Sequence, residues 1–342
     1  MMFYPNQKSS FATRETTGFG TKLALLKKRK DMRRKEKFIT LAILLFLVLF
    51  SIPTKSQAVK GTFLYTLSDF TGSIPYNWAR VSVDKERNEI YVLYQDSVRV
   101  FNNAGMEVYR FGDDLDLGHI VDVSFDPMGD IFLLAYKESE SVIIRCNYRG
   151  EPQSKIELRD LSPQFLEFSP TRMIYQDGHF YLENHGDMRV VVTDKEGNFQ
   201  RGYDLIPLLE LKEKDRGNME IAGFSVDKEG NILITVPVLF RACILSPDGT
   251  FSWFGRPGSV LGKFNIVAGI VRDSRGNYLV VDKLKCAVMV FDKDFNFLTQ
   301  FGYRGLNPGN LIAPDEIAID DSDRIYVTQT RKRGVSVFKL TD

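Results

Sequence analysis

The sequence has few of the residues that carry most protein chemistry. Only three histidines, three cysteines and two tryptophans occur in 342 positions. Cys146, Cys243 and Cys286 cannot all pair within the chain, and their spacing matches no zinc or redox motif. Each of the three falls in an apolar run, which predicts small buried core residues.

Catalytic and metal-binding patterns are missing as well. His119, His179 and His185 are too few and too scattered to predict a metal site, which needs three or four convergent ligands with supporting groups. No Gly-x-Ser-x-Gly motif follows a strand pattern, and the glycine-rich stretches lack the strand-to-helix setting of a phosphate loop. We therefore predict no catalytic, cofactor-binding or metal-binding residues.

The near-neutral net charge of +1 hides two different parts. Residues 1–37 contain eleven Lys or Arg and three acidic residues, and Lys55 is the one further charge before residue 59, so residues 59–342 carry −8. Such an asymmetry indicates that a basic arm and an acidic domain work in different surroundings. The arm, residues 1–37, shows no periodicity over its first part and is expected to be disordered and cytoplasmic.

An apolar segment follows the basic arm. Residues 38–52 contain no charge and come directly after a cluster of Lys and Arg at 27–37. This combination predicts membrane insertion with the basic side held in the cytoplasm. We divide the chain into the arm 1–37, a transmembrane or signal segment 38–54, a linker 55–60 and a domain 61–342, which would lie outside the cytoplasm.

The fate of the apolar segment stays open between two outcomes. The long basic leader favours a retained single-pass anchor, although the segment is short for a spanning helix. Small residues at Ser56-Gln57-Ala58 would suit cleavage and release into the periplasm. A chance apolar stretch in a cytosolic protein is the third alternative.

A repeat of 42 to 52 residues runs through the domain. It is marked by an Asp-rich turn between two apolar strands, as in Asp227-Lys228-Glu229-Gly230-Asn231. The turn recurs six times, at Arg87, Gly129, Gly178, Gly230, Gly276 and Asp323. Periods of this length with strand-like content are typical of propeller blades with four short strands each. We expect an all-β, six-bladed propeller.

The two ends of the domain predict how the ring closes. The last repeat stops at its third strand, residues 335–340, whereas residues 61–67 resemble the fourth strands of other repeats. The N-terminal strand should therefore complete the sixth blade.

The repeated aspartates are candidates for calcium binding, because hard cations prefer carboxylate oxygens. They lie in different blades, however, and no turn has the dense pattern of a calcium loop. We predict that they accept hydrogen bonds within their own turns; they are Asp84, Asp126, Asp227, Asp273 and Asp320.

The last two repeats resemble a known family. The order Phe301-Gly302, Gly305, Gly309, Leu311, Pro314, a strand ending in Asp320 and a strand ending in Val337-Phe338 is similar to the NHL-repeat six-bladed propellers of the TolB-like superfamily. The resemblance implies a bacterial protein that is exported or membrane-anchored. It also implies two functions for such rings, protein interaction in the cell envelope or lactonase- and lyase-like catalysis on a small molecule at the central channel.

Binding is the function that the sequence favours. RNA binding, which occurs in animal relatives of this propeller, needs a basic face and suits neither export nor the charge of −8. A loop patch of basic residues in blades 5 and 6 is the candidate contact for an acidic partner: Lys283, Lys285, Arg331, Lys332 and Arg333. The alternative is that these residues are simply solvated loop positions. We expect a monomeric, non-enzymatic scaffold that binds a protein partner without a cofactor.

Overall fold

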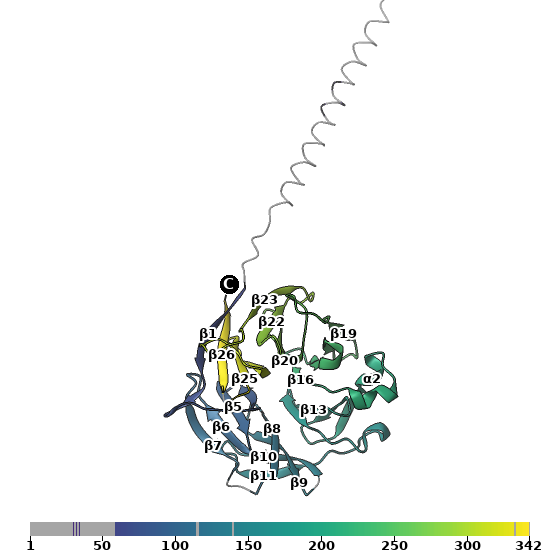
Figure 1. Ribbon diagram of the computed structural model, residues 1–342. Coiled ribbons are helices and arrows are strands. Elements are labelled where there is room, and N and C mark those ends of the chain that lie inside the picture. Colours follow the sequence, from purple (N-terminus) through teal and green to yellow (C-terminus); the bar gives the residue numbers. More distant parts are fainter. Residues whose placement is uncertain are drawn as a thin grey trace, which may run out of the picture. The chain divides into compact units, whose positions relative to one another are not determined.

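The computed structural model describes residues 59–113, 116–138, 140–331 and 333–341, together with Lys30, Met32 and Arg34. Within these residues, six four-stranded antiparallel sheets surround a central channel as the blades of a propeller (Figure 1). The ring belongs to the compact unit Ala58–Asp342. The expected fold class, an all-β six-bladed propeller, is confirmed.

In blades 1 to 5 the four strands follow one another along the chain, and the first strand lines the channel. Blade 1 consists of β4 (Arg80–Asp84), β5 (Glu89–Tyr94), β6 (Ser97–Phe101) and β7 (Glu107–Phe111). Blade 2 consists of β8 (His119–Phe125), β9 (Ile131–Lys137), β10 (Glu140–Cys146) and β11 (Pro152–Ile156). Blade 3 consists of β12 (Arg172–Gln176), β13 (His179–Asn184), β14 (Arg189–Asp194) and β15 (Phe199–Asp204).

The remaining blades follow the same plan. Blade 4 consists of β16 (Gly223–Val226), β17 (Ile232–Val236), β18 (Arg241–Leu245) and β19 (Phe251–Phe254). Blade 5 consists of β20 (Val267–Arg272), β21 (Tyr278–Asp282), β22 (Ala287–Phe291) and β23 (Phe297–Phe301). Blade 6 begins with β24 (Pro314–Ile319), β25 (Arg324–Gln329) and β26 (Val335–Thr341).

The sixth blade is completed from the other end of the domain. Strand β1 (Lys60–Thr66) pairs antiparallel with β26 (Figure 1). Lys60 lies opposite Thr341. The ring of Phe63 packs edge-on against Phe338 of β26, with 5.6 Å between the ring centroids. The predicted closure by the N-terminal strand is therefore confirmed.

Apolar side chains hold the blades together. The second strand of blade 5, β21, is buried along its whole length, because neighbouring blades cover both of its faces. This explains the continuous apolar runs of the repeat. Six buried clusters of the described residues each join two neighbouring blades; Leu279 and Ile325, for example, belong to the cluster between blades 5 and 6.

The cysteines are part of this core. All three are buried and unpaired, in three different clusters between blades. Burial raises the pKa of the Cys146 and Cys243 thiols to about 12, so both stay protonated at neutral pH. The prediction that they are core residues is confirmed.

Short elements occur in the connections between strands. The connection from blade 6 to blade 1 forms a small hairpin of β2 (Ser68–Asp69) and β3 (Gly72–Ser73). Short helices of one or two turns are η1 (Pro163–Phe165), α2 (Leu205–Leu208), η2 (Glu213–Asn218) and η3 (Pro237–Leu239). The Asp204 carboxylate caps α2 by accepting the backbone N–H of Ile206.

In the part of the chain that the structure describes, no helix is long and apolar enough to cross a membrane. The predicted arm 1–37, except for its three described residues, and the apolar segment 38–54 lie outside the described residues. So do the linker up to residue 58 and the alternative cleavage site at Ala58.

Candidate functional site

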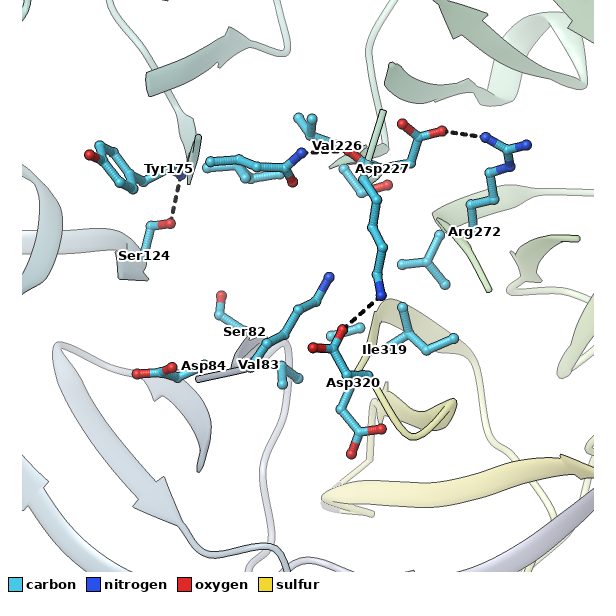
Figure 2. Close-up of a pocket in the computed structure, with 18 of the residues that line it drawn as sticks. Ser82, Val83, Asp84, Ser124, Tyr175, Val226, Asp227, Arg272, Ile319 and Asp320 are labelled. Carbon is cyan, nitrogen blue, oxygen red and sulfur yellow. Dashed lines mark hydrogen bonds and ion pairs between the residues drawn. The ribbon is translucent and has the colours of Figure 1, made fainter. Parts of the chain in front are cut away.

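One end of the central channel opens into a recess of about 610 Å³ (Figure 2). All six blades contribute to its wall through the first strand and the turn that follows it. The strands therefore bring together turns that lie more than forty residues apart in the sequence. Figure 2 shows Ser82, Val83, Val226 and Ile319 around the opening.

The repeated aspartates stand at the mouth of this recess, where each first strand ends. The Oδ1 atom of Asp273 accepts the backbone N–H groups of Arg275 and Asn277 at 3.0 and 2.8 Å, and its Oδ2 accepts the Asn277 amide at 2.8 Å. Asp227 makes the same three bonds, and Asp84, Asp126 and Asp320 each accept two backbone N–H groups from two to four positions on. The prediction that these carboxylates stabilise turns is confirmed.

Side chains at the mouth also tie neighbouring blades together. The Ser124 hydroxyl of blade 2 accepts the backbone N–H of Tyr175 in blade 3 at 2.7 Å (Figure 2). Arg272 of blade 5 donates to the Asp227 carboxylate of blade 4 at 2.9 Å (Figure 2). Because these bonds join adjacent turns, the wall of the recess is a connected frame.

A network of charged side chains closes the deep end of the recess. Arg172 begins β12, so it lies at the end of that strand farthest from the mouth. Its guanidinium donates two hydrogen bonds to the Glu316 carboxylate, at 2.7 and 3.1 Å, and one to Asp122 at 3.0 Å. Arg80 also contacts Glu316, at 3.5 Å. We call Arg80, Asp122, Arg172, Glu316 and the neighbouring Glu183 the channel network.

Glu183 is the exceptional member of the network. Its side chain is buried, Oε2 accepts a hydrogen bond from the Thr171 hydroxyl at 3.4 Å, and Oε1 has no partner among the described residues. Burial raises its pKa to about 8, although Arg172 and Arg80 act in the opposite direction. When Glu183 is protonated, the other four members of the network are two guanidinium groups and two carboxylates. Their charges cancel at neutral pH.

A few polar side chains at the mouth are not used by the frame. The side chains of Lys85, Glu86 and Asp177 line the recess and form no hydrogen bond or ion pair with other described residues. Lys85 is half-buried and the two acidic residues are exposed. These three charged groups are among the side chains that a bound partner can use.

The histidines do not converge on the recess. His119 lies 2.6 Å from the Asp96 carboxylate, at the start of β8. His179 begins β13 and contacts the backbone of Asp177, and His185 follows β13 and contacts Thr171. Within the described ranges, no three His, Cys, Asp or Glu side chains are grouped closely enough to hold a metal ion.

The predicted basic loop patch lies at the opposite end of the strands from the recess. Lys283 and Lys285 directly follow β21, and Arg331 and Arg333 follow β25 in the neighbouring blade. Lys283 pairs with Asp315 at 2.6 Å, and Lys285 donates to the carbonyl oxygens of Ser259 and Val260. Lys283 is therefore paired with strand β24 and Lys285 with the connection before β20, while Arg331 is exposed. Lys332 lies outside the described residues.

The sequence analysis did not predict the channel network. Arg172 and Glu316 belong to first strands of different repeats and lie 144 positions apart. Nothing in a single repeat distinguishes them from other polar residues at strand ends. The sequence did carry one signal for the network: some first strands begin with a charged residue, as β4 and β12 do.

Comparisons with known proteins agree with the fold. Residues 264–342 match a family model described as a six-bladed β-propeller. Among curated proteins, none matches the chain.

Several solved structures share the fold at low sequence identity. A protein of unknown function from Bacteroides thetaiotaomicron is 12% identical, with a TM-score of 0.59 over 83% of this chain and 76% of that chain. An auxiliary nutrient binding protein from Bacteroides ovatus is 15% identical, with a TM-score of 0.56 over 83% and 76%.

An enzyme is among the similar structures too. A catalytically inactive histidine-to-alanine variant of virginiamycin B lyase from Staphylococcus aureus, with quinupristin, is 10% identical, with a TM-score of 0.52 over 79% of this chain and 83% of that chain. At such identities the likeness shows the propeller fold and leaves the function to be argued from the site.

Proposed function

We propose that this chain is a non-enzymatic binding propeller that holds a protein partner at the mouth of its central channel. The observation that carries the proposal is the recess itself, a hollow of about 610 Å³ with a wall tied blade to blade and a deep end closed by charged pairs. Binding sites are typically concave and largely formed before the ligand arrives. The buried aspartates of the mouth serve their own turns, so they act as structural groups.

The unused side chains at the mouth suit a polypeptide. Lys85 offers an ammonium group, and Glu86 and Asp177 offer carboxylates, at three points around one opening. Loops of this kind, held by a rigid scaffold, are where binding residues commonly lie. A peptide segment with positive and negative side chains would pair with these three groups. Its apolar side chains would contact the valines and isoleucines below them.

The proposal includes a location. We infer that the propeller works outside the cytoplasm, in the cell envelope, as a monomer anchored by residues 38–54. The uncharged run and the basic cluster before it support this topology. Cleavage near Ala58 and release into the periplasm is the alternative.

We also propose that the ring is of the NHL-repeat type, within the TolB-like superfamily, and bacterial. The support is the motif from Phe301-Gly302 to Val337-Phe338, which lies in the same two blades that the family model matches.

A lyase- or lactonase-like activity is the rival function. The similar lyase structure carries a histidine-to-alanine substitution and is described as catalytically inactive. In this chain all three histidines lie in described segments, and none lines the recess. The chemistry at the mouth therefore supports binding over catalysis.

The test is a pull-down from detergent-solubilised membranes with the full chain as bait. In the Ser82→Trp variant an indole would project into the recess and occupy part of it, because Ser82 lines it (Figure 2). The matched control, Ser154→Trp, makes the same change at an exposed position of the outermost strand β11. We expect the wild type and the control to capture the same protein, and Ser82→Trp to lose it while keeping its melting temperature. Equal capture by all three chains would refute a partner site in the recess.

A further inference from the structure

A group of exposed apolar side chains lies at the far ends of the strands that form the recess. Trp78 precedes β4, Ile266 precedes β20 and Leu284 follows β21, with exposed fractions of 69, 42 and 52%. The opposite ends of these strands lie at the recess. Strands of five or six residues span about 17–20 Å, so this is a separate surface.

Contacts between neighbouring connections join these residues into one surface. The Lys283 ammonium lies 6.0 Å from the centroid of the Trp78 ring, and the Lys283 backbone N–H donates to the Ile266 carbonyl at 2.8 Å. The neighbouring Lys285 ammonium donates to the Val260 carbonyl at 2.7 Å. We call Trp78, Val260, Ile266 and the loop 283–285 the Trp78 surface. It combines residues from three connections of blades 4, 5 and 6.

The backbone of Trp78 is unusual for an exposed residue. Its φ is +58°, in the left-handed region that bulky side chains rarely adopt. The fold gains little from an indole that is 69% exposed, and the conformation costs free energy. Folding therefore gives no reason for tryptophan at this position, whereas binding does, because tryptophan is enriched among the residues that dominate protein interfaces.

The connections beside Trp78 are basic, although its own connection, residues 67–79, contains one acidic residue and no Lys or Arg. The connections 255–266, 283–286, 302–313 and 330–334 contain eight Lys or Arg and no Asp or Glu. In contrast, the connections 112–118 and 157–171 of blades 1 to 3 contain six acidic residues and one Arg, and the whole domain carries −8. The basic charge is therefore concentrated on the part of the ring that also exposes the apolar side chains.

We propose that the Trp78 surface docks an acidic protein segment that inserts apolar side chains beside the Trp78 indole. This is a second site, independent of the proposed partner site in the recess. The exposed Arg331 and the other basic connections attract the acidic groups of the segment.

The contacts of the two lysines favour a protein over a lipid surface. The Lys283 ammonium already pairs with Asp315, and the Lys285 ammonium is held by two carbonyl oxygens. These bonds keep the loop and the exposed Leu284 in one shape. A defined shape is what a complementary protein surface recognises, whereas a fluid headgroup layer needs only mobile charge and apolar area.

The test measures binding of labelled synthetic peptides to the full chain in detergent. The peptides are graded in net charge, and each is made with and without Trp and Leu residues. We expect the acidic apolar peptides to bind best, with an affinity that falls as salt is added. Trp78→Gly should weaken this binding about tenfold or more, since removal of an interface tryptophan is typically that costly.

The glycine substitution separates binding from folding. Glycine adopts positive φ readily, so Trp78→Gly should melt at the wild-type temperature or above it. The matched control is Tyr148→Asn, which removes another exposed aromatic side chain, in the turn between β10 and β11; it should bind as the wild type does. Ser82→Trp should also bind these peptides normally, because its site is the recess.

Three results would overturn the proposal. One is equal peptide affinity for the wild type and Trp78→Gly, and another is an affinity that does not depend on peptide charge. The third is that no peptide binds, that the chain floats with phosphatidylglycerol vesicles, and that Trp78→Gly weakens this flotation. That result would assign the surface to lipid.

Discussion

The guanidinium of Arg172 and the carboxylate of Glu316 form a two-point pair across the central channel, at 2.7 and 3.1 Å. Arg172 belongs to blade 3 and Glu316 to blade 6, and blades three positions apart in a ring of six face each other. The pair therefore bridges the channel directly. It joins two opposite blades at the deep end of the recess.

Removing the arginine should destabilise the whole ring. In Arg172→Met, the carboxylates of Asp122 and Glu316 lose their main cation while only 3 and 15% of these side chains is exposed. A buried charge that loses its partner typically costs about 3–5 kcal/mol. We expect the free energy of unfolding, measured by urea titration, to fall by about that amount.

Two further variants make this prediction specific. Arg145→Met is the control. It removes the pair with Asp130, in which the arginine side chain is 48% exposed, so it should lower the free energy of unfolding by at most about 1 kcal/mol. In Arg172→Met/Glu316→Met both charges are replaced, and part of the lost stability should return. A double variant less stable than Arg172→Met alone would contradict the account of the pair.

Glu183 should make stability depend on pH in the direction opposite to most carboxyl groups. Its pKa in the folded state is about 8, against 4.5 for the ordinary group. Below pH 4.5 the carboxyl is protonated in both states and no cost arises. Between pH 4.5 and about 8 the folded state keeps a proton that the unfolded state has lost, so stability falls as the pH rises. Above pH 8 the cost stays constant, on the order of a few kcal/mol.

Glu183→Gln cannot ionise and should lack this slope. Urea titrations of the wild type and the variant across this range should show curves that diverge as the pH rises, with the variant the more stable at pH 8. Parallel curves would mean that Glu183 is ionised in the folded ring throughout.

Much of the fold was predictable because it depends on local chemistry that the repeat displays. The turn of Asp273, with a carboxylate that accepts N–H groups two and four positions on, needs the same residue types wherever it occurs. Strand β21 is apolar throughout because it is buried on both faces. The orphan strand at residues 61–67 could be matched to the incomplete last blade by pattern alone.

The site was less predictable because it depends on ring geometry. Arg172 and Glu316 meet only when six blades have closed, so no local pattern links them. The basic loop patch was found from the positions of Lys283 and Lys285 after equivalent strands, but the exposed Trp78 beside them was not. Its importance comes from its positive φ and its exposure, which a sequence does not show.

The proposed anchor predicts the mass of the mature chain. If residues 38–54 stay in the membrane, mass spectrometry of protein extracted from membranes should find residues 1–58 still joined to the domain. Protein recovered from the periplasm that lacks the first 58 residues would show that the segment is a cleaved signal. Alkaline carbonate washing of the membranes should leave an anchored chain in place.

Closure of the ring by β1 can be tested at Gly61. A Cβ atom at this position would lie 2.2 Å from the Phe301 ring of β23, so β1 can pass blade 5 only with glycine there. Gly61→Val should push the strand outward and cost about 1–3 kcal/mol, as overpacked positions usually do. Gly186→Val is the control, because a Cβ atom there would lie 3.8 Å from its nearest neighbour and the residue is exposed.

Deletion of residues 60–69 should lower the melting temperature of the whole ring in one transition, since blade 6 then has a free edge at β26. A wild-type melting curve after the deletion would refute closure by this strand.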